Sequence, residues 1–372
     1  MIRKTTKKWT ILIYADGNNE MNDTMYNAML ACKKAGSNKN INVIMQIGLI
    51  NNNENKYSDI WSGVRRYYIK RNNPLLIEDL GKVNMADPNS LYKFIKWGME
   101  NYKAEQYMLI LSGHGADFVG CLTDLSLNVP YIMGIPEMIK AINSIKENSK
   151  DKIDVLVLDM CYMNSIEIIY ELGKAEDTVV KSMVTYTDYA PYEGLSYDKL
   201  IFFIKKYSKV HDLNLFLKYL IDNLKFNLTA FEINHKKLEQ IKNLFNDLAY
   251  SYNNNNEIIQ NPIDLINNLT PKSELPDCIK NINNKLWSII IYSKTKFNGI
   301  NNSIKITSNH INKLIFFYYK LAFAKNNYWT NLLSNISLDQ QVTTENKIKV
   351  RPINSSYPVV HHILEFNSFT NN

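Results

Sequence analysis

Cysteine is scarce in this chain of 372 residues, which contains only four. They lie far apart, and no two of them form a C-x-x-C pair. So few cysteines in so long a chain exclude a disulfide-stabilised scaffold, and the missing pair argues against a structural zinc site or a thioredoxin-type redox centre. The four are Cys32, Cys121, Cys161 and Cys278.

Arginine is also scarce, with five residues, so lysine supplies nearly all of the positive charge. The formal net charge of +7 is mild for the length. Proteins that bind nucleic acids usually concentrate arginine in a patch, whereas the one dense basic stretch here, residues 3–8, is typical of a solvated tail. We therefore expect no nucleic-acid partner.

Long apolar runs are absent as well, so no segment is predicted to cross a membrane. The first eight residues carry positive charge, but no apolar signal-like run follows before a strand-like segment begins at Trp9. We expect a cytoplasmic protein without a membrane partner, or a secreted one whose leader has been removed. The sequence leaves the oligomeric state open.

Short apolar segments alternate with helical patterns over the first half of the chain. Residues 153–159 (IDVLVLD) form a continuous apolar run, which is typical of a strand buried on both faces. Comparable segments lie at 9–15, 41–47, 106–112 and 178–186. Helices are predicted between them at 21–34, 87–102, 136–145 and 164–172. Strands joined by helices predict an α/β fold with a mostly parallel sheet that is covered on both faces.

The pattern changes after residue 197, where helical periodicity dominates the segments 213–224 and 238–250. A chain of this length has room for two units, or for one large α/β unit with an appendage. We expect residues 1–228 to form the core. Residues 229–372 should form a more divergent helical or mixed region that packs on it.

Two reactive side chains follow strands of the predicted sheet. His114 comes after the strand at 106–112, and Cys161 comes after the strand at 153–159. They lie 47 residues apart, a spacing that fits a single crossover with one helix, so the two strands are expected to be adjacent and parallel. Ligands bind at the carboxyl ends of such strands, and the imidazole and the thiol should share one edge of the sheet.

A cysteine attacks a carbonyl as its thiolate, which a nearby imidazole or a helix N-terminus favours. Cys161 is expected where the next helix begins, and the backbone amides of Gly115 and Cys161 could stabilise an oxyanion. Either His114 or Cys161 alone would be better explained as a structural residue, since a free cysteine is usually buried and inert. Their matching positions favour a catalytic pair.

The segments WTILIYADGNNEM, LILSGHGADFVG, VLVLDMCYMNSIEIIYEL and TYTDYAPYEGLSY, in this order, resemble the clostripain family of cysteine peptidases. The likeness covers roughly residues 9–200. It implies a caspase-like αβα sandwich, with Cys161 as the nucleophile and His114 as the general base and acid. It also implies a peptide or protein substrate that is cleaved after Arg or Lys.

The resemblance further implies acidic residues at the floor of the pocket that receives the basic side chain. Asp159 matches the family's position, and Asp188 is the second candidate. A carboxylate there could pair with a guanidinium or an ammonium group, although Asp159 could instead merely cap the next helix. Thr185 and Thr187 lie where the family's substrate-lining strand would run, so their backbone could pair with a peptide.

No cofactor is expected. Some members of the family use calcium, and residues 16–20 (DGNNE) offer oxygen ligands, but they lack the glycine and the distal glutamate of a calcium-binding loop. We interpret this segment as a turn and predict no metal ligands.

A competing interpretation is a caspase-like scaffold that binds peptides without cutting them. Phosphate-binding loops, serine-nucleophile elbows and zinc-peptidase motifs are all absent. The intact pair of His114 and Cys161 favours the peptidase over the silent scaffold.

Overall fold

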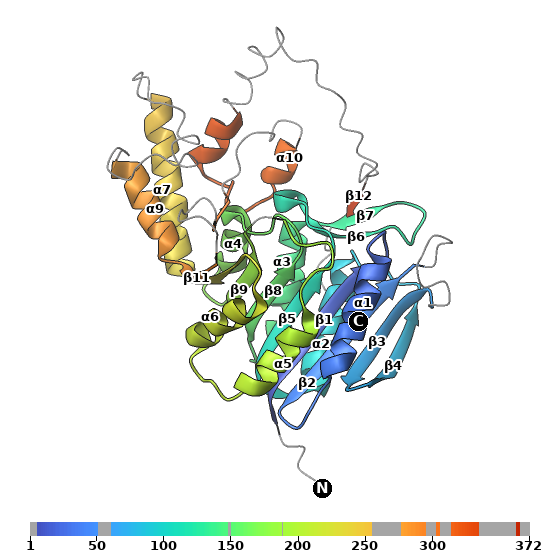
Figure 1. The fold of residues 1–372 in the computed structure, drawn as a ribbon. Coiled ribbons are helices and arrows are strands. Elements are labelled where there is room, and N and C mark those ends of the chain that lie inside the picture. Colours follow the sequence, from blue (N-terminus) through green and yellow to red (C-terminus); the bar gives the residue numbers. More distant parts are fainter. Residues whose placement is uncertain are drawn as a thin grey trace.

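The computed structural model describes residues 6–50, 61–147, 150–187, 189–254, 277–294, 303–305, 314–334 and 362–364. Within this part of the chain, nine strands form a central sheet in the order β11-β10-β9-β8-β5-β1-β2-β3-β4, with helices packed on it (Figure 1).

The five inner strands of the sheet, in the order β9-β8-β5-β1-β2, run parallel to one another. All residues of β2 and β8 are buried, which explains why their sequences are mostly apolar, with Asn42, Gln46, Asp154 and Asp159 as buried polar exceptions. This confirms the mostly parallel α/β sheet predicted from the sequence. The five strands are β1 (Lys7–Gly17), β2 (Ile41–Leu49), β5 (Ala104–Ser112), β8 (Ile153–Asp159) and β9 (Val180–Tyr186).

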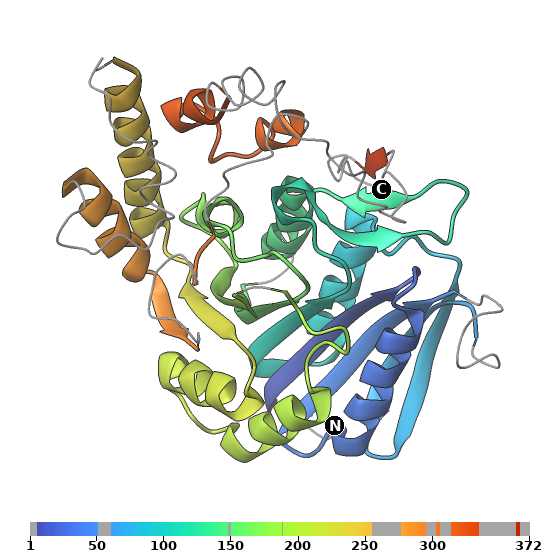
Figure 2. The ribbon, with the colours of Figure 1, turned by 45° about the horizontal axis from the view of Figure 1, so that its top comes forward.

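Antiparallel strands extend the sheet on both sides, as Figure 2 shows. The hairpin of β3 (Gly63–Lys70) and β4 (Asn73–Gly81) lies beside β2. On the other side, β10 (Leu228–Glu232) pairs with β9, and β11 (Ile290–Ser293) pairs with β10. The five parallel strands are therefore flanked by antiparallel strands, which need no crossover helix to join them.

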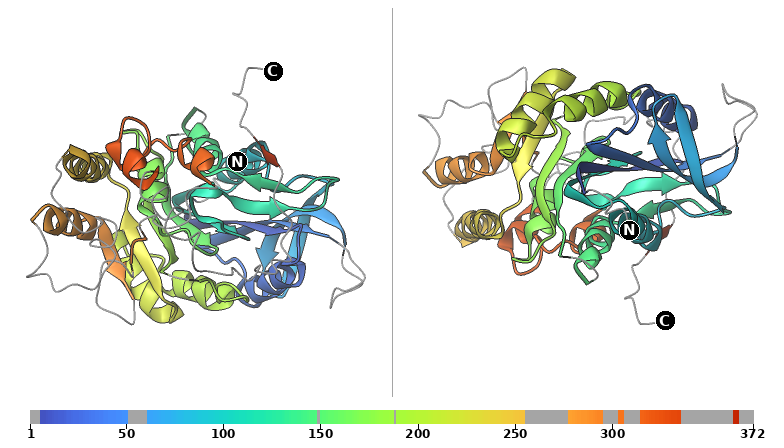
Figure 3. Two further views of the ribbon diagram at one scale, coloured as in Figure 1. Left: turned by 90° about the horizontal axis from the view of Figure 1, so that it is seen from above. Right: turned by 90° about the horizontal axis from the view of Figure 1, so that it is seen from below.

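Helices cover both faces of the sheet, which makes the αβα sandwich (Figure 3). Their apolar side chains belong to two separate clusters, one for each face. The first face carries α1 (Asn22–Ala35), α5 (Tyr197–Tyr207) and α6 (Leu213–Leu224). The second carries α2 (Pro88–Asn101), α3 (Ile135–Asn143) and α4 (Ile166–Gly173).

The start of α2 is fixed by local sequence. Asp87 is the N-cap, and its side chain accepts a hydrogen bond of 2.9 Å from the amide of Asn89. Pro88 occupies the first helical position, where its missing N–H costs nothing. The helix predicted at 87–102 is confirmed.

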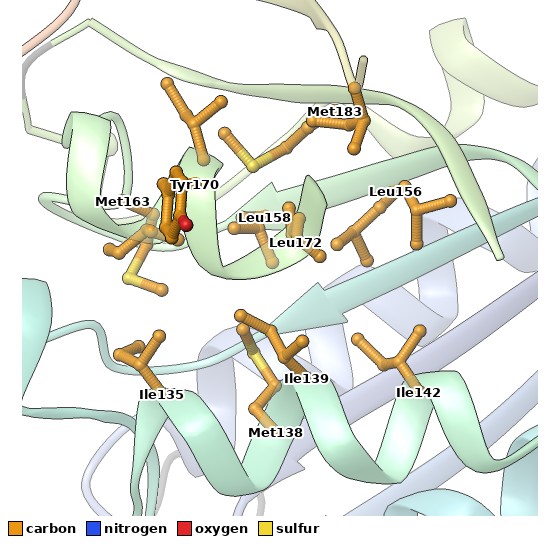
Figure 4. Packing of buried hydrophobic residues seen from close by; sticks show 14 of the residues in the cluster. Ile135, Met138, Ile139, Ile142, Leu156, Leu158, Met163, Tyr170, Leu172 and Met183 are labelled. Carbon is orange, nitrogen blue, oxygen red and sulfur yellow. The ribbon is translucent and has the colours of Figure 1, made fainter. Parts of the chain in front are cut away.

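A rigid core lies between α3, β8 and α4 (Figure 4). Four buried side chains of α3 follow the i, i+3, i+4, i+7 spacing of an apolar stripe and pack toward buried residues of β8 and α4. They are Ile135, Met138, Ile139 and Ile142. This packing fixes the strand and the helix on either side of Cys161.

A small second sheet lies beside the loop that follows β5. It contains β6 (Cys121–Asp124), β7 (Tyr131–Met133) and β12 (His362–Leu364). β6 and β7 are antiparallel, and β12 runs parallel to β7. The loop after β5 is thereby held between the main sheet and this small one.

The C-terminal region continues the core. The boundary predicted between residues 228 and 229 falls inside β10, which begins at Leu228. Helices after this point contribute side chains to the hydrophobic cluster that α2, α3 and α4 share. They include α7 (His235–Asn254), α9 (Asp277–Trp287) and α10 (Ile315–Tyr318). The two predicted parts therefore share a sheet and a core.

None of the helices in the described ranges is long and apolar enough to cross a membrane.

Candidate active site

Two loops at the carboxyl edge of the sheet carry His114 and Cys161. β5 and β8 are neighbours, and their last residues, Ser112 and Asp159, are paired in register. His114 lies two residues beyond Ser112, and Cys161 lies two residues beyond Asp159. Because paired strands are about 4.8 Å apart, these equal offsets place the imidazole and the thiol at the same edge. The two residues that the sequence singles out therefore follow paired strand ends.

The two loops touch at Gly115. A Cβ atom at this position would overlap the carbonyl oxygen of Cys161 and would lie 3.1 Å from Sδ of Met163. Glycine permits this approach because it has no side chain. The backbone that follows His114 therefore packs directly against the loop of the thiol.

The amides of Gly115 and Cys161 are available as hydrogen-bond donors. Gly115 forms an antiparallel bridge with Cys121, in which the amide of Ala116 donates to Gly120 and the amide of Leu122 donates to His114, so the amide of Gly115 is not used. Among the described residues, neither Gly115 N nor Cys161 N has an acceptor. Two such donors beside a nucleophile can stabilise a developing oxyanion.

The helix expected at Cys161 begins later than predicted. α4 starts at Ile166, five residues beyond the cysteine, and Tyr162 adopts a left-handed turn with φ of 61°. The prediction that Cys161 lies at a helix N-terminus is wrong, because this turn and the residues before Ser165 separate the two. Activation of the thiol must then come from side chains at the site.

The other cysteines are poor candidates for a nucleophile. Cys32 and Cys121 are fully buried, and burial raises the pKa of both thiols far above its usual range. Cys278 is exposed on α9, away from the carboxyl edge. Cys161 is half-buried, and among the four it alone lies beside a histidine at a strand end.

Sequence reasoning missed a third polar residue of the site, Glu20. Its Oε1 lies 2.9 Å from Nε2 of His114, and the interaction with the imidazole is the main cause of the lowered pKa of Glu20. The available signal was an acidic residue shortly after β1, the strand next to β5, within a segment that was interpreted only as a turn.

Asp159 is the last residue of β8 and is 3% exposed. Its carboxylate accepts hydrogen bonds from the hydroxyl groups of Ser112 (2.9 Å), Tyr186 (2.8 Å) and Tyr197 (2.7 Å), and from the amide of Leu195 (3.2 Å). Burial raises its pKa in spite of these donors. Asp159 does not cap α4. It anchors the segment after β9 beneath the site.

The two threonines serve the fold. Thr185 is fully buried in β9, between Leu158 of β8 and Thr229 of β10, so no free strand edge remains there for a peptide. The amide and hydroxyl of Thr187 both donate to the carbonyl oxygen of Asn227, and its own carbonyl oxygen accepts from a side-chain amide. The predicted peptide pairing at these two residues is not supported by this geometry. Asp188, the second acidic candidate, lies outside the described residues.

The expectation that the turn at 16–20 holds no metal ion stays a prediction. Among the described residues, no group of three or more His, Cys, Asp or Glu side chains could hold a metal ion. Burial and the neighbouring Asp124 raise the pKa of Asp16 well above its usual value. No step of a reaction is assigned to a metal here.

An imidazole and a thiol on neighbouring parallel strands of an αβα sandwich define the caspase-like class of cysteine peptidases. The chain belongs to the clostripain family, whose family model matches residues 13–347. That range contains both His114 and Cys161.

Individual relatives agree with this family. The clostripain of Hathewaya histolytica is 25% identical in an alignment of 233 residues, and this alignment covers 55% of this chain and 43% of that protein. The match thus spans less than half the length of this curated relative.

Two solved structures share the fold. A secreted cysteine protease from Bacteroides thetaiotaomicron, in complex with an irreversible peptide inhibitor, is 13% identical, with 88% of this chain and 99% of that chain covered and a TM-score of 0.60. An inactive zymogen protease from Parabacteroides distasonis is 16% identical, with 87% and 99% covered and a TM-score of 0.60. At these identities the likeness shows the fold alone.

Proposed function

We propose that this protein is a cysteine endopeptidase in which Cys161 and His114 form the catalytic dyad. The observation that carries the proposal is the register of β5 and β8, which sets the two residues at equal distances beyond a paired Ser112 and Asp159. Membership of the clostripain family supports the same chemistry.

The reaction follows from the groups at the site. His114 takes the proton of Cys161, and the sulfur attacks the carbonyl carbon of the scissile bond. The amides of Gly115 and Cys161 donate to the resulting oxyanion. His114 then gives its proton to the leaving amine as the C–N bond breaks, which leaves an acyl-enzyme. Water, deprotonated by His114, attacks this thioester and releases the acid.

Glu20 acts in this scheme as a positioning residue for His114. Its carboxylate orients the imidazole through Nε2 and stabilises the imidazolium that forms while His114 holds a proton. In the proposed mechanism Glu20 touches neither the substrate nor the sulfur.

Glu20→Gln should lower kcat by about tenfold with little change in KM, because the neutral amide holds the ring but does not stabilise its positive charge. Steady-state kinetics on the best peptide substrate measure this split. Glu105→Gln is the matched control, since Glu105 pairs with Lys8 near the amino end of its strand. An unchanged kcat in the Glu20 variant would remove this residue from the site.

We further propose that the substrate carries Arg or Lys immediately before the scissile bond. The support for this proposal is Asp159, the acid that matches the family's pocket position, and Glu20, whose half-exposed side chain lies beside His114. A carboxylate at the site would attract a cationic side chain, whereas Asp117 is already paired with Lys305.

A panel of fluorogenic peptides tests both proposals. Peptides that end in Arg, Lys, Asp, Asn or Ala are incubated with the wild type and with Cys161→Ala. Turnover of only the basic peptides, lost in the variant, is the expected result. Binding of peptides without turnover of any would favour the silent scaffold instead. The expectation of a cytoplasmic location stays a prediction.

The active enzyme should remain uncut between residues 115 and 139. No Lys or Arg occurs between His114 and Lys140, so a peptidase specific for basic residues has no site there. Intact-mass spectrometry of the purified active enzyme measures this. Two fragments that separate within 115–139 would contradict either the specificity or the absence of processing in this loop.

A further inference from the structure

Residues 303–305 run beside the loop that follows Cys161, although they are some 140 residues away in the sequence. The amide of Lys305 donates to the carbonyl oxygen of Asn164, and the carbonyl oxygen of Lys305 accepts from the amide of Ile166, each at 3.0 Å. These bonds form a parallel bridge between Lys305 and Ser165. The backbone of Lys305 is thus fixed to the chain between the thiol and α4.

The side chain of Lys305 reaches the other catalytic loop. Its Nζ lies 2.5 Å from Oδ2 of Asp117, which is three residues beyond His114. The same nitrogen lies 5.1 Å from the centre of the Tyr162 ring, next to Cys161. One residue therefore contacts both the loop of the imidazole and the turn of the thiol.

The two residues that Lys305 contacts both hold unfavourable backbone conformations. Asp117 has φ of 55° and Tyr162 has φ of 61°, in the left-handed region that residues with a side chain seldom adopt. Such conformations persist where surrounding contacts fix them. The Asp117 side chain is 15% exposed, so loss of its cation would leave a mostly buried charge without a partner.

The segment that carries Lys305 is itself anchored in the sheet. Oγ of Ser303 lies 2.9 Å from Oγ of Ser293 in β11, which lies 2.6 Å from Oγ1 of Thr229 in β10. The segment that carries Lys305 is therefore linked by hydrogen bonds to β11, and through it to β10.

We propose that Lys305 is a positioning residue that clasps the two catalytic loops together and so sets the separation of His114 from Cys161. The proposal rests on the peptidase function proposed above, and it gives the C-terminal region a role in building the active site. The backbone bonds hold the thiol's loop, while the ammonium group holds the Asp117 loop and packs on Tyr162.

Lys305→Met removes the charge and keeps most of the side-chain length. We expect kcat to fall about tenfold with KM within about twofold, because the dyad is displaced while the substrate pocket is kept. Lys305→Arg should restore most of the activity, since a guanidinium pairs with Asp117 and stacks on Tyr162. Lys181→Met is the matched control, because Lys181 also pairs with a buried aspartate, Asp154, at 2.6 Å.

Asp117→Asn removes the other partner of the same ion pair, and it replaces the lysine variant in the test if that variant folds poorly. It should cause a similar loss of kcat, and the double variant should lose no more than either single one. Three results would contradict the proposed role of Lys305. They are additive losses in the double variant, a rise in KM alone, and a kcat of Lys305→Met within about twofold of the wild type.

The rate at which iodoacetamide alkylates Cys161 separates this proposal from the peptidase proposal. The reagent is small and neutral, so its rate reports the thiol and its imidazole without any peptide. A several-fold slower rate in Lys305→Met supports the clasp, and an equal rate contradicts it. A wild type that cleaves no peptide would instead refute the proposed function.

Discussion

Cys161→Ala should lose more than about 10⁴-fold in kcat/KM on the best basic peptide, because no other group at the site can form the acyl-enzyme. The remaining cysteines are not substitutes: Cys32 and Cys121 are buried with raised pKa values, and Cys278 lies on α9. The measurement is an initial rate at substrate concentrations below KM, with the enzyme checked for an unchanged melting temperature.

Cys278→Ala is the control for this loss and should keep the activity of the wild type. His114→Ala should lose most of the activity as well, since the thiol then has no base beside it. Full activity in Cys161→Ala would show that Cys161 is not the nucleophile and would refute the proposed dyad.

Asp159→Asn should discriminate between basic and neutral substrates. Breaking a buried ion pair costs about 3 kcal/mol, so kcat/KM for Arg and Lys peptides should fall by about 100-fold. Ser112 and Tyr197 donate to one carboxylate oxygen and Tyr186 to the other, so the amide oxygen can keep one of these sets while the amide nitrogen donates to the remaining hydroxyl oxygen. The side chain thus stays hydrogen-bonded, which keeps the loops in place. Alkylation of Cys161 by neutral iodoacetamide should therefore proceed at nearly the wild-type rate.

The same variant has an expected signature in stability. Because burial raises the pKa of Asp159, the folded state binds this proton more tightly than the unfolded state. The contribution of Asp159 to stability is then greatest below the ordinary Asp pKa and falls as the pH rises through its folded pKa. The melting temperature of the variant minus that of the wild type should increase from acidic to neutral pH. A fall in peptide turnover matched by equally slow alkylation would make Asp159 purely structural.

Much of the fold could be predicted because the central strands are buried on both faces. Their sequences, such as IDVLVLD in β8, are continuous apolar runs that differ visibly from the helical patterns between them. The start of α2 could be predicted as well, since Asp87 is its N-cap and Pro88 is its first residue, so the signal lies at the helix end itself. Signals of this kind are local in the chain.

The positions of His114 and Cys161 were also predictable, because a parallel sheet brings the ends of adjacent strands together. The start of α4 was not, since the turn at Tyr162 carries no glycine to mark it. The predicted pairing of Thr185 with a peptide failed because β10 occupies that side of β9. β10 comes from a part of the chain whose pattern does not show which strand it joins.

Glu20 and Lys305 were missed for a different reason. Each contributes a single charged side chain to the site from a segment whose local sequence indicates only a turn or a loop. Their roles depend on contacts with residues about 94 and 188 positions away, respectively, which no local pattern records. Charged residues at loops are common, so sequence alone gives no reason to select these two.

The most direct test of the account is the mass-spectrometric location of the adduct formed by an Arg-based chloromethyl ketone. This reagent combines the proposed specificity with the proposed nucleophile. The account predicts one adduct, on Cys161, that forms in the wild type and is lost in His114→Ala. Equal labelling of Cys32 or Cys278, or labelling of Cys161 that persists without His114, would contradict it.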